Sequence, residues 1–205
     1  MSFDIILKYF PSLTSQQKKL YHHFYDLLID INSKINLISR KDIANFYEHH
    51  VLHSLAIGKM VQFKNTDKVI DIGTGGGLPG IPLAILFPNT HFTLLDACMK
   101  KINAVETMIH ALNLTNVTTI CCRSEEYDSG VRYDYILGRA VTNINNFIKH
   151  TKFLLAPMGK ILYLNGTGEY NSCHSKIYPL RDIFTESYFA TKQLMIFENI
   201  SLHNL

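Results

Sequence analysis

The sequence lacks the features of a membrane or secreted protein. It contains no run of about 18 apolar residues, the length that spans a bilayer, and its start, MSFDIILKYF, has neither a basic region nor a long apolar core. Its four cysteines include no C-x-x-C pair, so neither a disulfide framework nor a zinc site is indicated. We therefore expect a cytoplasmic protein with reduced, buried thiols, no membrane association and no bound metal.

Charge is also scarce and is unevenly distributed. Only 18% of the 205 residues are charged, and the formal net charge is +3. The whole excess lies in residues 1–68, which hold nine Lys or Arg and six Asp or Glu, whereas residues 69–205 hold eleven of each. A basic appendage on a neutral core suggests a nucleic-acid substrate, although a few solvated lysines would give the same totals.

The most informative stretch is Lys68–Gly80, KVIDIGTGGGLPG. An apolar run that leads into five glycines within eight residues predicts a buried strand, a tight turn and the start of a helix. In an α/β sheet such a turn binds a nucleotide-like ligand. The spacing of Gly75–Gly80 is G-x-G-x-x-G, so a dinucleotide is one candidate.

Three residues of this region favour a ligand without phosphate. Pro79 has no N–H to offer a pyrophosphate, and Pro82 removes another. Asp71, at the end of the strand, would repel a pyrophosphate and attract an ammonium group. S-adenosylmethionine carries an ammonium, a sulfonium and two ribose hydroxyls but no phosphate, so we favour it as the cofactor. The alternatives are NAD and a glycine turn that binds nothing.

Polar side chains at the ends of later strands extend this predicted site. Asp96 ends the second strand, where its carboxylate can hold both ribose hydroxyls of either cofactor. Ser124 and Glu125 follow the third strand and can read the adenine amine. Arg139 follows the fourth strand and is expected to face the methionine carboxylate or a phosphate or guanine oxygen of the substrate. A surface turn without ligand, for Ser124 and Glu125, and a structural salt bridge, for Arg139, are the alternatives.

Hydrophobic periodicity predicts the order of helices and strands. A capping box at Thr14–Gln17 starts an amphipathic helix, and Asp42 can cap a second one. Further helices are expected over 81–87, 104–112 and 147–155, and strands over 69–72, 91–96, 117–122, 133–137, 160–164, 183–189 and 193–197, the last two as an antiparallel hairpin.

This alternation predicts an α/β fold: a doubly wound, mostly parallel, seven-stranded Rossmann-like methyltransferase sheet with an N-terminal helical extension. We expect the helical subdomain to occupy residues 1–62, packed on the core. The S-adenosylmethionine-binding domain is expected to occupy residues 63–205.

Two short motifs receive no catalytic role. His49 and His53 stand four apart on one helix face, a spacing that can chelate a metal, but no glutamate or third ligand accompanies them. We expect a polar patch near a substrate or partner instead. Tyr188 and Lys192 match the Y-x-x-x-K pair of short-chain dehydrogenases, but they straddle the expected hairpin, so we treat the match as chance.

Over nearly its whole length the sequence resembles the bacterial ribosomal RNA small subunit methyltransferase G family, also called glucose-inhibited division protein B. The most specific part is the G-L-P-G-I-P run. The resemblance is carried by Asn36–Ser39 with Arg40 and Asp42, His50–Leu55, Asp71–Pro82, Phe92–Asp96, Arg123–Glu125 and Arg139-Ala140. It implies methylation of guanine N7 in the decoding-region loop of 16S ribosomal RNA, with S-adenosylmethionine as the methyl donor.

The same resemblance implies which residues contact the cofactor. By position they are Gly73, Leu78, Ser124, Glu125 and Arg139, to which we add Gly75 and Asp96 on physical grounds.

The sequence departs from the family pattern at three positions. His53 replaces an aspartate, Gly138 a serine, and Asn165 a lysine. The missing lysine is expected to weaken RNA affinity or slow turnover without affecting the cofactor pocket.

Guanine N7 carries a free lone pair, so its attack on the sulfonium methyl needs no deprotonation. We therefore assign no catalytic residue and expect catalysis by positioning and electrostatics. The expected partner is 16S ribosomal RNA or the small ribosomal subunit, bound by the basic extension of a monomer. Two other functions stay open: an NAD-dependent oxidoreductase, and an RNA-binding module that holds the cofactor without turnover.

Overall fold

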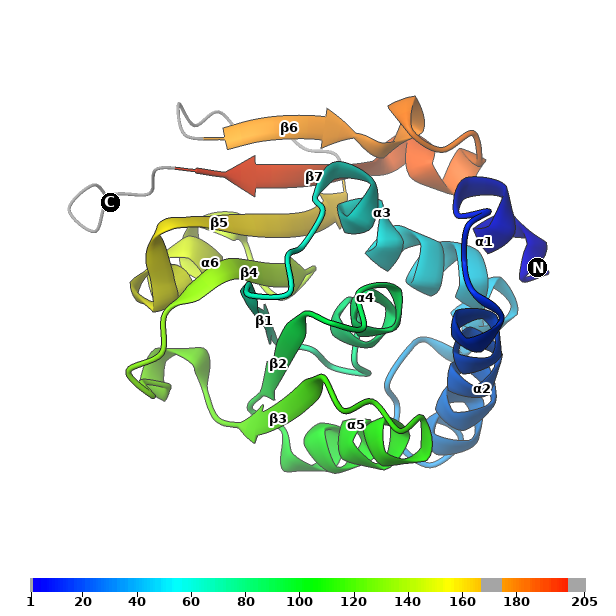
Figure 1. Cartoon of the computed structure of the whole chain (residues 1–205), viewed down its shortest axis with the longest axis horizontal. Helices are drawn as coiled ribbons and strands as arrows, with labels where there is room; N and C mark the ends of the chain where they lie inside the picture. Colours follow the sequence, from blue (N-terminus) through cyan, green and yellow to red (C-terminus); the bar gives the residue numbers. More distant parts are fainter. Residues whose placement is uncertain (1, 167–174, 199–205) are drawn as a thin grey trace.

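The helices of the fold are arranged around one seven-stranded sheet (Figure 1). The computed structural model describes residues 2–166 and 175–198, and its strands follow the order β3-β2-β1-β4-β5-β7-β6. The first five strands are parallel, whereas β7 is antiparallel to both β5 and β6. The doubly wound, mostly parallel sheet expected from the sequence is confirmed. Its strands are β1 (Lys68–Ile72), β2 (His91–Asp96), β3 (Val117–Cys121), β4 (Tyr133–Arg139), β5 (Leu155–Gly166), β6 (Ser175–Pro179) and β7 (Lys192–Phe197).

Each side of the sheet has its own hydrophobic cluster. Val69 packs on one side with α4 (Gly80–Leu86), α5 (Met99–Ala111) and the N-terminal helices, whereas its neighbour Ile70 packs on the other side with α6 (Ile144–Thr151). Because both sides are covered, β1 is buried over four successive residues. The helices predicted over 81–87 and 104–112 are confirmed. The helix predicted over 147–155 ends at Thr151, and Leu155 already begins β5.

A helical extension covers the first of these two sides. It consists of α1 (Asp4–Tyr9), α2 (Ser15–Asn32), the 3-10 helix η1 (Arg40–Asn45), the π-helix η2 (Phe46–Leu52) and α3 (His53–Met60). The capping box predicted at the start of α2 is present. Thr14 Oγ1 accepts from the Gln17 N–H at 3.1 Å, and Gln17 Oε1 accepts from the Thr14 N–H at 3.0 Å.

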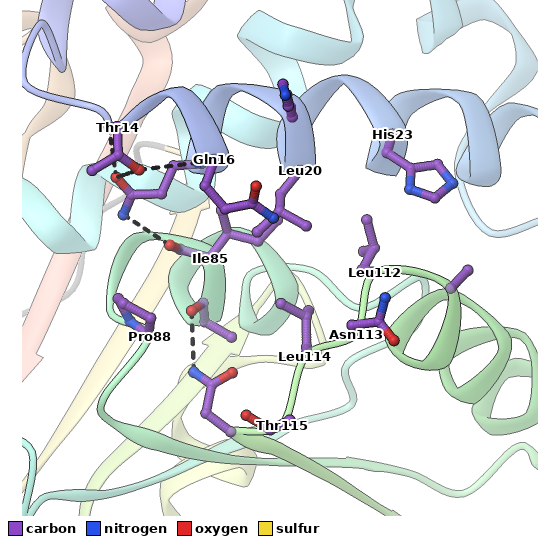
Figure 2. A pocket seen from close by; sticks show the side chains of 15 residues that line it. Thr14, Gln16, Leu20, His23, Ile85, Pro88, Leu112, Asn113, Leu114 and Thr115 are labelled. Atoms are coloured by element: carbon purple, nitrogen blue, oxygen red, sulfur yellow. Dashed lines mark hydrogen bonds between the residues drawn. The ribbon is translucent and has the colours of Figure 1, made fainter.

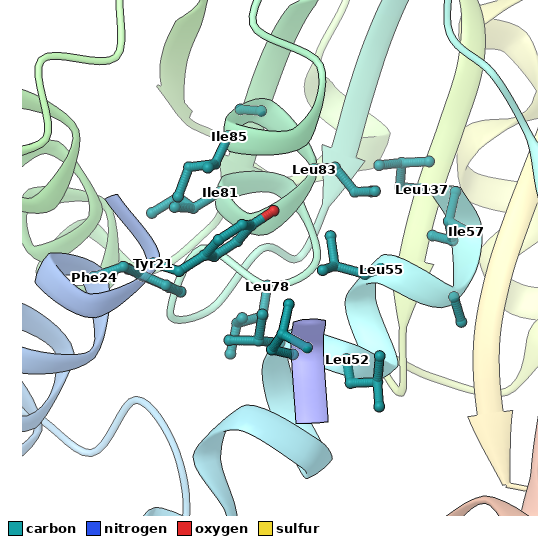
Figure 3. Packing of buried hydrophobic residues seen from close by; sticks show 14 of the residues in the cluster. Tyr21, Phe24, Leu52, Leu55, Ile57, Leu78, Ile81, Leu83, Ile85 and Leu137 are labelled. Atoms are coloured by element: carbon teal, nitrogen blue, oxygen red, sulfur yellow. The ribbon is translucent and has the colours of Figure 1, made fainter. Parts of the chain in front are cut away.

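Tyr21 of α2 joins the extension to the core (Figure 3). Its ring is fully buried together with that of Phe24, and its hydroxyl donates to the Pro82 carbonyl at 2.9 Å. The extension and the sheet therefore share one hydrophobic cluster. The predicted boundary at residue 62 falls in the segment between α3 and β1.

The predicted cap at Asp42 is wrong. Asp42 lies within η1, and no side chain caps that helix. The Asp42 carboxylate instead contacts the His49 ring, with 2.8 Å between Oδ1 and Nδ1. The second helix begins only at Phe46, as a π-helix.

The strand predicted over 183–189 is also wrong. The chain there holds the 3-10 helices η5 (Leu180–Asp182) and η6 (Ser187–Thr191), and β7 pairs with β6 in the antiparallel arrangement that had been expected for 183–189. Phe184 packs edge-on against Tyr9 of α1, with 4.8 Å between ring centroids, and the Tyr9 hydroxyl donates to Glu186 at 2.7 Å. The apolar residues of this segment thus bury against the extension rather than in the sheet.

Other expectations concern thiols and membranes. Cys98, Cys121 and Cys122 are free thiols, but the expected burial is wrong, because Cys98 is exposed and Cys121 and Cys122 are half-buried. Cys173 lies outside the described residues. Within residues 2–166 and 175–198, no helix has both the length and the apolar character needed to span a bilayer.

Candidate functional site

A cavity of about 490 Å³ lies at the carboxyl ends of the central strands. β1 lies between β2 and β4, so the chain crosses over in opposite directions on its two sides, and open α/β sheets bind ligands at this point. The residues that line the cavity come from the ends of these strands and the segments after them, from the segment that follows β3, and from α5 and α6. They are Ile72, Gly73, Leu95, Asp96, Ala97, Lys101, Cys122, Arg123, Ser124, Glu125, Arg139, Ala140, Val141, Thr142, Asn146 and His150.

The glycine turn after β1 is tied to the end of β2. The Gly73 N–H donates to the Leu95 carbonyl at 2.8 Å. Gly73 has φ +69°, and a Cβ at this position would lie 2.8 Å from Cγ1 of Val141. Glycine is therefore needed at position 73 both for the backbone conformation and for the close approach of the segment after β4.

Asp96 presents a fixed carboxylate at this edge of the sheet. Oδ2 accepts from the Gly75 N–H and Oδ1 from the Cys98 N–H, each at 2.9 Å. A carboxylate oxygen accepts about two hydrogen bonds, so each oxygen keeps an acceptor position for a ligand. An oriented pair of acceptors of this kind matches two neighbouring hydroxyls of a ribose.

Asp71 does not face the cavity as the sequence had suggested. Its side chain is fully buried, and Oδ2 accepts from the Thr74 hydroxyl at 2.6 Å and from the Gly80 N–H at 3.0 Å. Burial raises the pKa of Asp71 to about 6, although both hydrogen bonds oppose the rise. The carboxylate expected to attract an ammonium group therefore holds the turn together.

The N-terminus of α4 offers no free amide to a phosphate. Pro79 has no N–H, the Gly80 N–H is bound by Asp71, and the Ile81 N–H donates to the Gly77 carbonyl at 2.7 Å. A dinucleotide needs such amides for its pyrophosphate. The site thus fits a nucleoside ligand without phosphate, which supports the interpretation of the prolines.

Ser124 and Glu125 lie in the short 3-10 helix η3 (Ser124–Glu126) after β3. The Ser124 hydroxyl donates to Glu125 Oε2 at 2.9 Å, and His150 Nδ1 lies 3.1 Å from Oε1. Hydrogen bonds from its own backbone N–H and from Ser124 hold the pKa of the Glu125 carboxyl below its usual range. Glu125 is thus an ionised hydrogen-bond acceptor at the rim of the cavity, and the exocyclic amine of an adenine needs such an acceptor.

Arg139 ends β4, and its half-buried guanidinium borders the cavity. Nη1 donates to the His49 carbonyl at 3.5 Å and Nη2 to Nδ1 of His50 at 3.3 Å. Among the ion pairs of the described residues, none includes Arg139 within 4.0 Å. Burial lowers the pKa of Arg139. The alternative considered for Arg139, a structural salt bridge, is therefore not formed among the described residues, and the guanidinium keeps N–H groups for an anion.

Five of the seven residues predicted to contact the cofactor line the cavity: Gly73, Asp96, Ser124, Glu125 and Arg139. Gly75 does not line the cavity, but its N–H donates to the carboxylate of Asp96, which does. The Leu78 side chain is elsewhere, buried in the hydrophobic cluster beneath α2 (Figure 3). The structure therefore gives no support to a side-chain contact of Leu78 with the cofactor.

The sequence analysis missed several lining residues. Val141 and Lys101 could have been found, because each lies within a few residues of a strand's carboxyl end. No local signal connects Arg139 with His50, since the two are 89 positions apart.

His49 and His53, the pair expected to form a polar patch near a substrate or partner, both contact Tyr188. His49 stacks on Tyr188 with 3.8 Å between ring centroids, and His53 Nδ1 lies 3.2 Å from the Tyr188 hydroxyl. Across the described part of the chain, no group of three or more His, Cys, Asp or Glu side chains is placed to hold a metal ion.

A second cavity, of about 460 Å³, lies at the opposite edge of the sheet (Figure 2). Lys19, Leu20 and His23 of α2 line it together with the ends of α4 and α5. It has neither a glycine turn nor a carboxylate at a strand end, so the cofactor site is assigned to the first cavity.

Sheet order, glycine turn and Asp96 together define a class, the S-adenosylmethionine-dependent methyltransferases of Rossmann-like fold. The fold is shared with a solved structure, a mutant of MtNAS in complex with S-adenosylmethionine, at a TM-score of 0.59 and 14% identity over 90% of this chain and 76% of that one. The chain belongs to the GidB family, rRNA small subunit methyltransferase G, whose model matches residues 16–179.

Curated relatives agree with this family over nearly their whole length. The Ribosomal RNA small subunit methyltransferase G of Bacteroides thetaiotaomicron is 45% identical over 203 residues, which cover 94% of this chain and 98% of that protein. The protein of the same name from Phocaeicola vulgatus is 43% identical over 203 residues, covering 94% and 96%. The family expected from the sequence is confirmed.

Proposed function

We propose that this protein transfers the methyl group of S-adenosylmethionine to N7 of a guanine in 16S ribosomal RNA. The observation that carries the choice of cofactor is the pair Asp71 and Asp96. Asp71 occupies the helix N-terminus that a pyrophosphate would need, whereas Asp96 presents free acceptor positions at the cavity. Family membership supports ribosomal RNA as the substrate.

The residues around the cavity suit the parts of this cofactor. Asp96 would accept from the two ribose hydroxyls, Ser124 and Glu125 would meet the adenine amine, and Arg139 would bind the methionine carboxylate. When bound, the cofactor supplies an electrophilic methyl group on its sulfonium. Guanine N7 attacks with a lone pair that carries no proton, so the side chains need only bind and orient the two reactants.

Basic residues of the extension lie both near the carboxyl ends of the strands and at the opposite end of the sheet. Arg40 and Lys41 are exposed and directly precede Asp42, which contacts His49 beside the cofactor cavity. Lys19 lines the second cavity, at the far edge. Because the target base must reach the cofactor, we propose that Arg40 and Lys41 contact the RNA backbone while the lysines of α2 do not. Such an enzyme would act in the cytoplasm, where its RNA is found.

Transfer of labelled methyl from S-adenosylmethionine to 16S RNA tests the proposal. RNA from cells that lack the protein should accept the label, and mass mapping should place it on one guanine. The melting temperature should rise with S-adenosylmethionine and not with NAD. Stabilisation by NAD alone, or cofactor binding without transfer in a single turnover, would reject the proposed activity.

A pair of charge reversals tests the RNA face. Arg40→Glu with Lys41→Glu should raise the KM for RNA about tenfold and flatten its salt dependence, because phosphate contacts are lost. Lys18→Glu with Lys19→Glu changes the net charge equally and serves as the control, with little change expected. Equal effects of the two pairs would show that only net charge matters.

A further inference from the structure

Four side chains connect the extension to the cofactor cavity: Asp42, His49, His50 and Arg139, here called the junction cluster. Arg139 belongs to β4, whereas the other three belong to η1 and η2. Both hydrogen bonds of the Arg139 guanidinium go to η2, one to the His49 carbonyl and one to the His50 ring. The orientation of this cavity residue therefore depends on a segment that does not itself line the cavity.

The chemistry of the contact fixes the protonation of His50. Arginine only donates hydrogen bonds, so Nδ1 of His50 must accept, and the ring proton must reside on Nε2. Burial, reinforced by the charge of Arg139, lowers the pKa of His50 to about 3, which keeps the ring neutral as an acceptor requires.

Asp42 orients the two histidines from the other side. Its Oδ1 lies 2.8 Å from Nδ1 of His49, and its Oδ2 lies 3.8 Å from Nε2 of His50. The buried Nε2 of His50 has no hydrogen-bond partner within the described part of the chain. The Asp42 carboxylate is too far from the His50 proton for a hydrogen bond, but its negative charge faces that side of the ring, so carboxylate, imidazole and guanidinium form a series with complementary polarity.

We infer that Asp42 and His50 are positioning residues that hold the Arg139 guanidinium ready for the anionic end of the cofactor. The inference rests on the proposed function, in which Arg139 binds the methionine carboxylate. An arginine side chain has several freely rotating bonds, and ordering them on binding costs affinity. Two acceptors from one rigid helix remove that freedom before the ligand arrives.

Two substitutions whose new side chains are similar in size and shape test the role of His50. His50→Leu removes the acceptor, whereas His50→Asn is of similar size and keeps an oxygen near the position of Nδ1. His50→Leu should raise the Kd for S-adenosylhomocysteine, measured by calorimetry, about tenfold, the effect of losing one hydrogen bond to a charged group. His50→Asn should remain within about threefold of the unmodified protein, because the acceptor is retained. In turnover assays His50→Leu should raise the KM for S-adenosylmethionine more than it lowers kcat.

A double-mutant cycle separates positioning from a structural role. In an Arg139→Gln background, His50→Leu should produce no further loss of affinity, because the group that it positions is absent. His53→Leu is the control, since His53 is equally buried but contacts Tyr188 instead of Arg139. It should lower the melting temperature and leave the Kd unchanged.

Each outcome decides the matter. An unchanged Kd in His50→Leu, an equal loss in His50→Asn, or a further loss in the Arg139→Gln background would overturn the positioning role. If His50→Leu does not fold, Asp42→Ala tests the positioning one step further back: it should raise the Kd for S-adenosylhomocysteine in the unmodified protein but not in the Arg139→Gln background, and its half-exposed side chain tolerates the change. Failure of the unmodified protein to bind the cofactor would instead refute the proposed function and this inference with it.

Discussion

Replacing Asp71 with asparagine is expected to change how the stability of the apo-protein depends on pH. Asp71 is fully buried, and its pKa is raised from 3.8 to about 6. The folded protein therefore favours the protonated carboxyl more than the unfolded chain does. The contribution of Asp71 to stability is fully present below pH 3.8 and is lost as the pH rises to about 6.

The size of the effect follows from the two pKa values. Each pKa unit corresponds to about 1.4 kcal/mol, so the free energy of unfolding should fall by about 3 kcal/mol over this window through Asp71 alone. The asparagine variant has no proton to lose. The difference between the two proteins, unmodified minus Asp71→Asn, should therefore decrease by most of that amount, about 2 kcal/mol, between pH 4 and pH 7, whatever the absolute cost of the substitution.

Urea unfolding of the two proteins at a series of pH values, followed by circular dichroism, measures this difference. Other titrating groups such as His50 and His53 are common to both proteins, so their contributions cancel. Thr74→Val provides a second arm. It removes the hydroxyl that stabilises the ionised carboxylate, so its cost should be greater at pH 7 than at pH 4. A difference between the proteins that is flat from pH 4 to pH 7 would refute the assignment of a buried, reluctantly ionised Asp71.

Three substitutions test the packing and ties of the fold by urea unfolding. Gly80→Ala should lower the free energy of unfolding by about 1–3 kcal/mol, because the new methyl would clash with the Leu94 side chain; an unchanged midpoint would contradict the tight packing of α4 on β2. Thr14→Ala removes the N-cap of α2 and should cost about 1 kcal/mol, whereas Thr14→Ser should be nearly neutral. Tyr9→Phe removes the hydroxyl that donates to Glu186 and should cost about 1–2 kcal/mol, and a neutral result would mean that water replaces the bond at no loss.

The parts of the fold that the sequence predicted are those with strong local signals. The apolar run over 69–72 and the glycines after it locate β1 and its turn, and the run over 91–96 matches β2 at both ends. The same logic located the cavity, because residues that follow parallel strands gather at one edge of the sheet. Five of the seven predicted contacts line it for that reason.

The errors come from residues whose partners are distant in the sequence. Residues 183–189 are rich in aromatic side chains, as strands are, but Phe184 packs against Tyr9 of the extension and against Phe189. Asp42 precedes a helix as a cap would, yet its carboxylate is used by His49. Asp71 was expected to face a ligand because it lies near the end of a strand. The direction of its side chain instead depends on the Gly80 N–H, which lies beyond the turn and binds its carboxylate.

The contact between Tyr9 and Glu186 links the start of the chain to a segment 177 positions later, with consequences for synthesis. When α1 leaves the ribosome, the residues that it binds have yet to be translated. Helix α2, η2 and the first strands can assemble earlier and give α1 its first partners, since Phe3 packs against Tyr21 and Tyr47, but Tyr9 lacks its own partners until residues 184–186 emerge. In a nascent chain that stalls before that point, the end of α1 therefore lacks its contacts, which leaves it more accessible to proteases and chaperones. The last contacts of α1 therefore form only late in the synthesis of the chain.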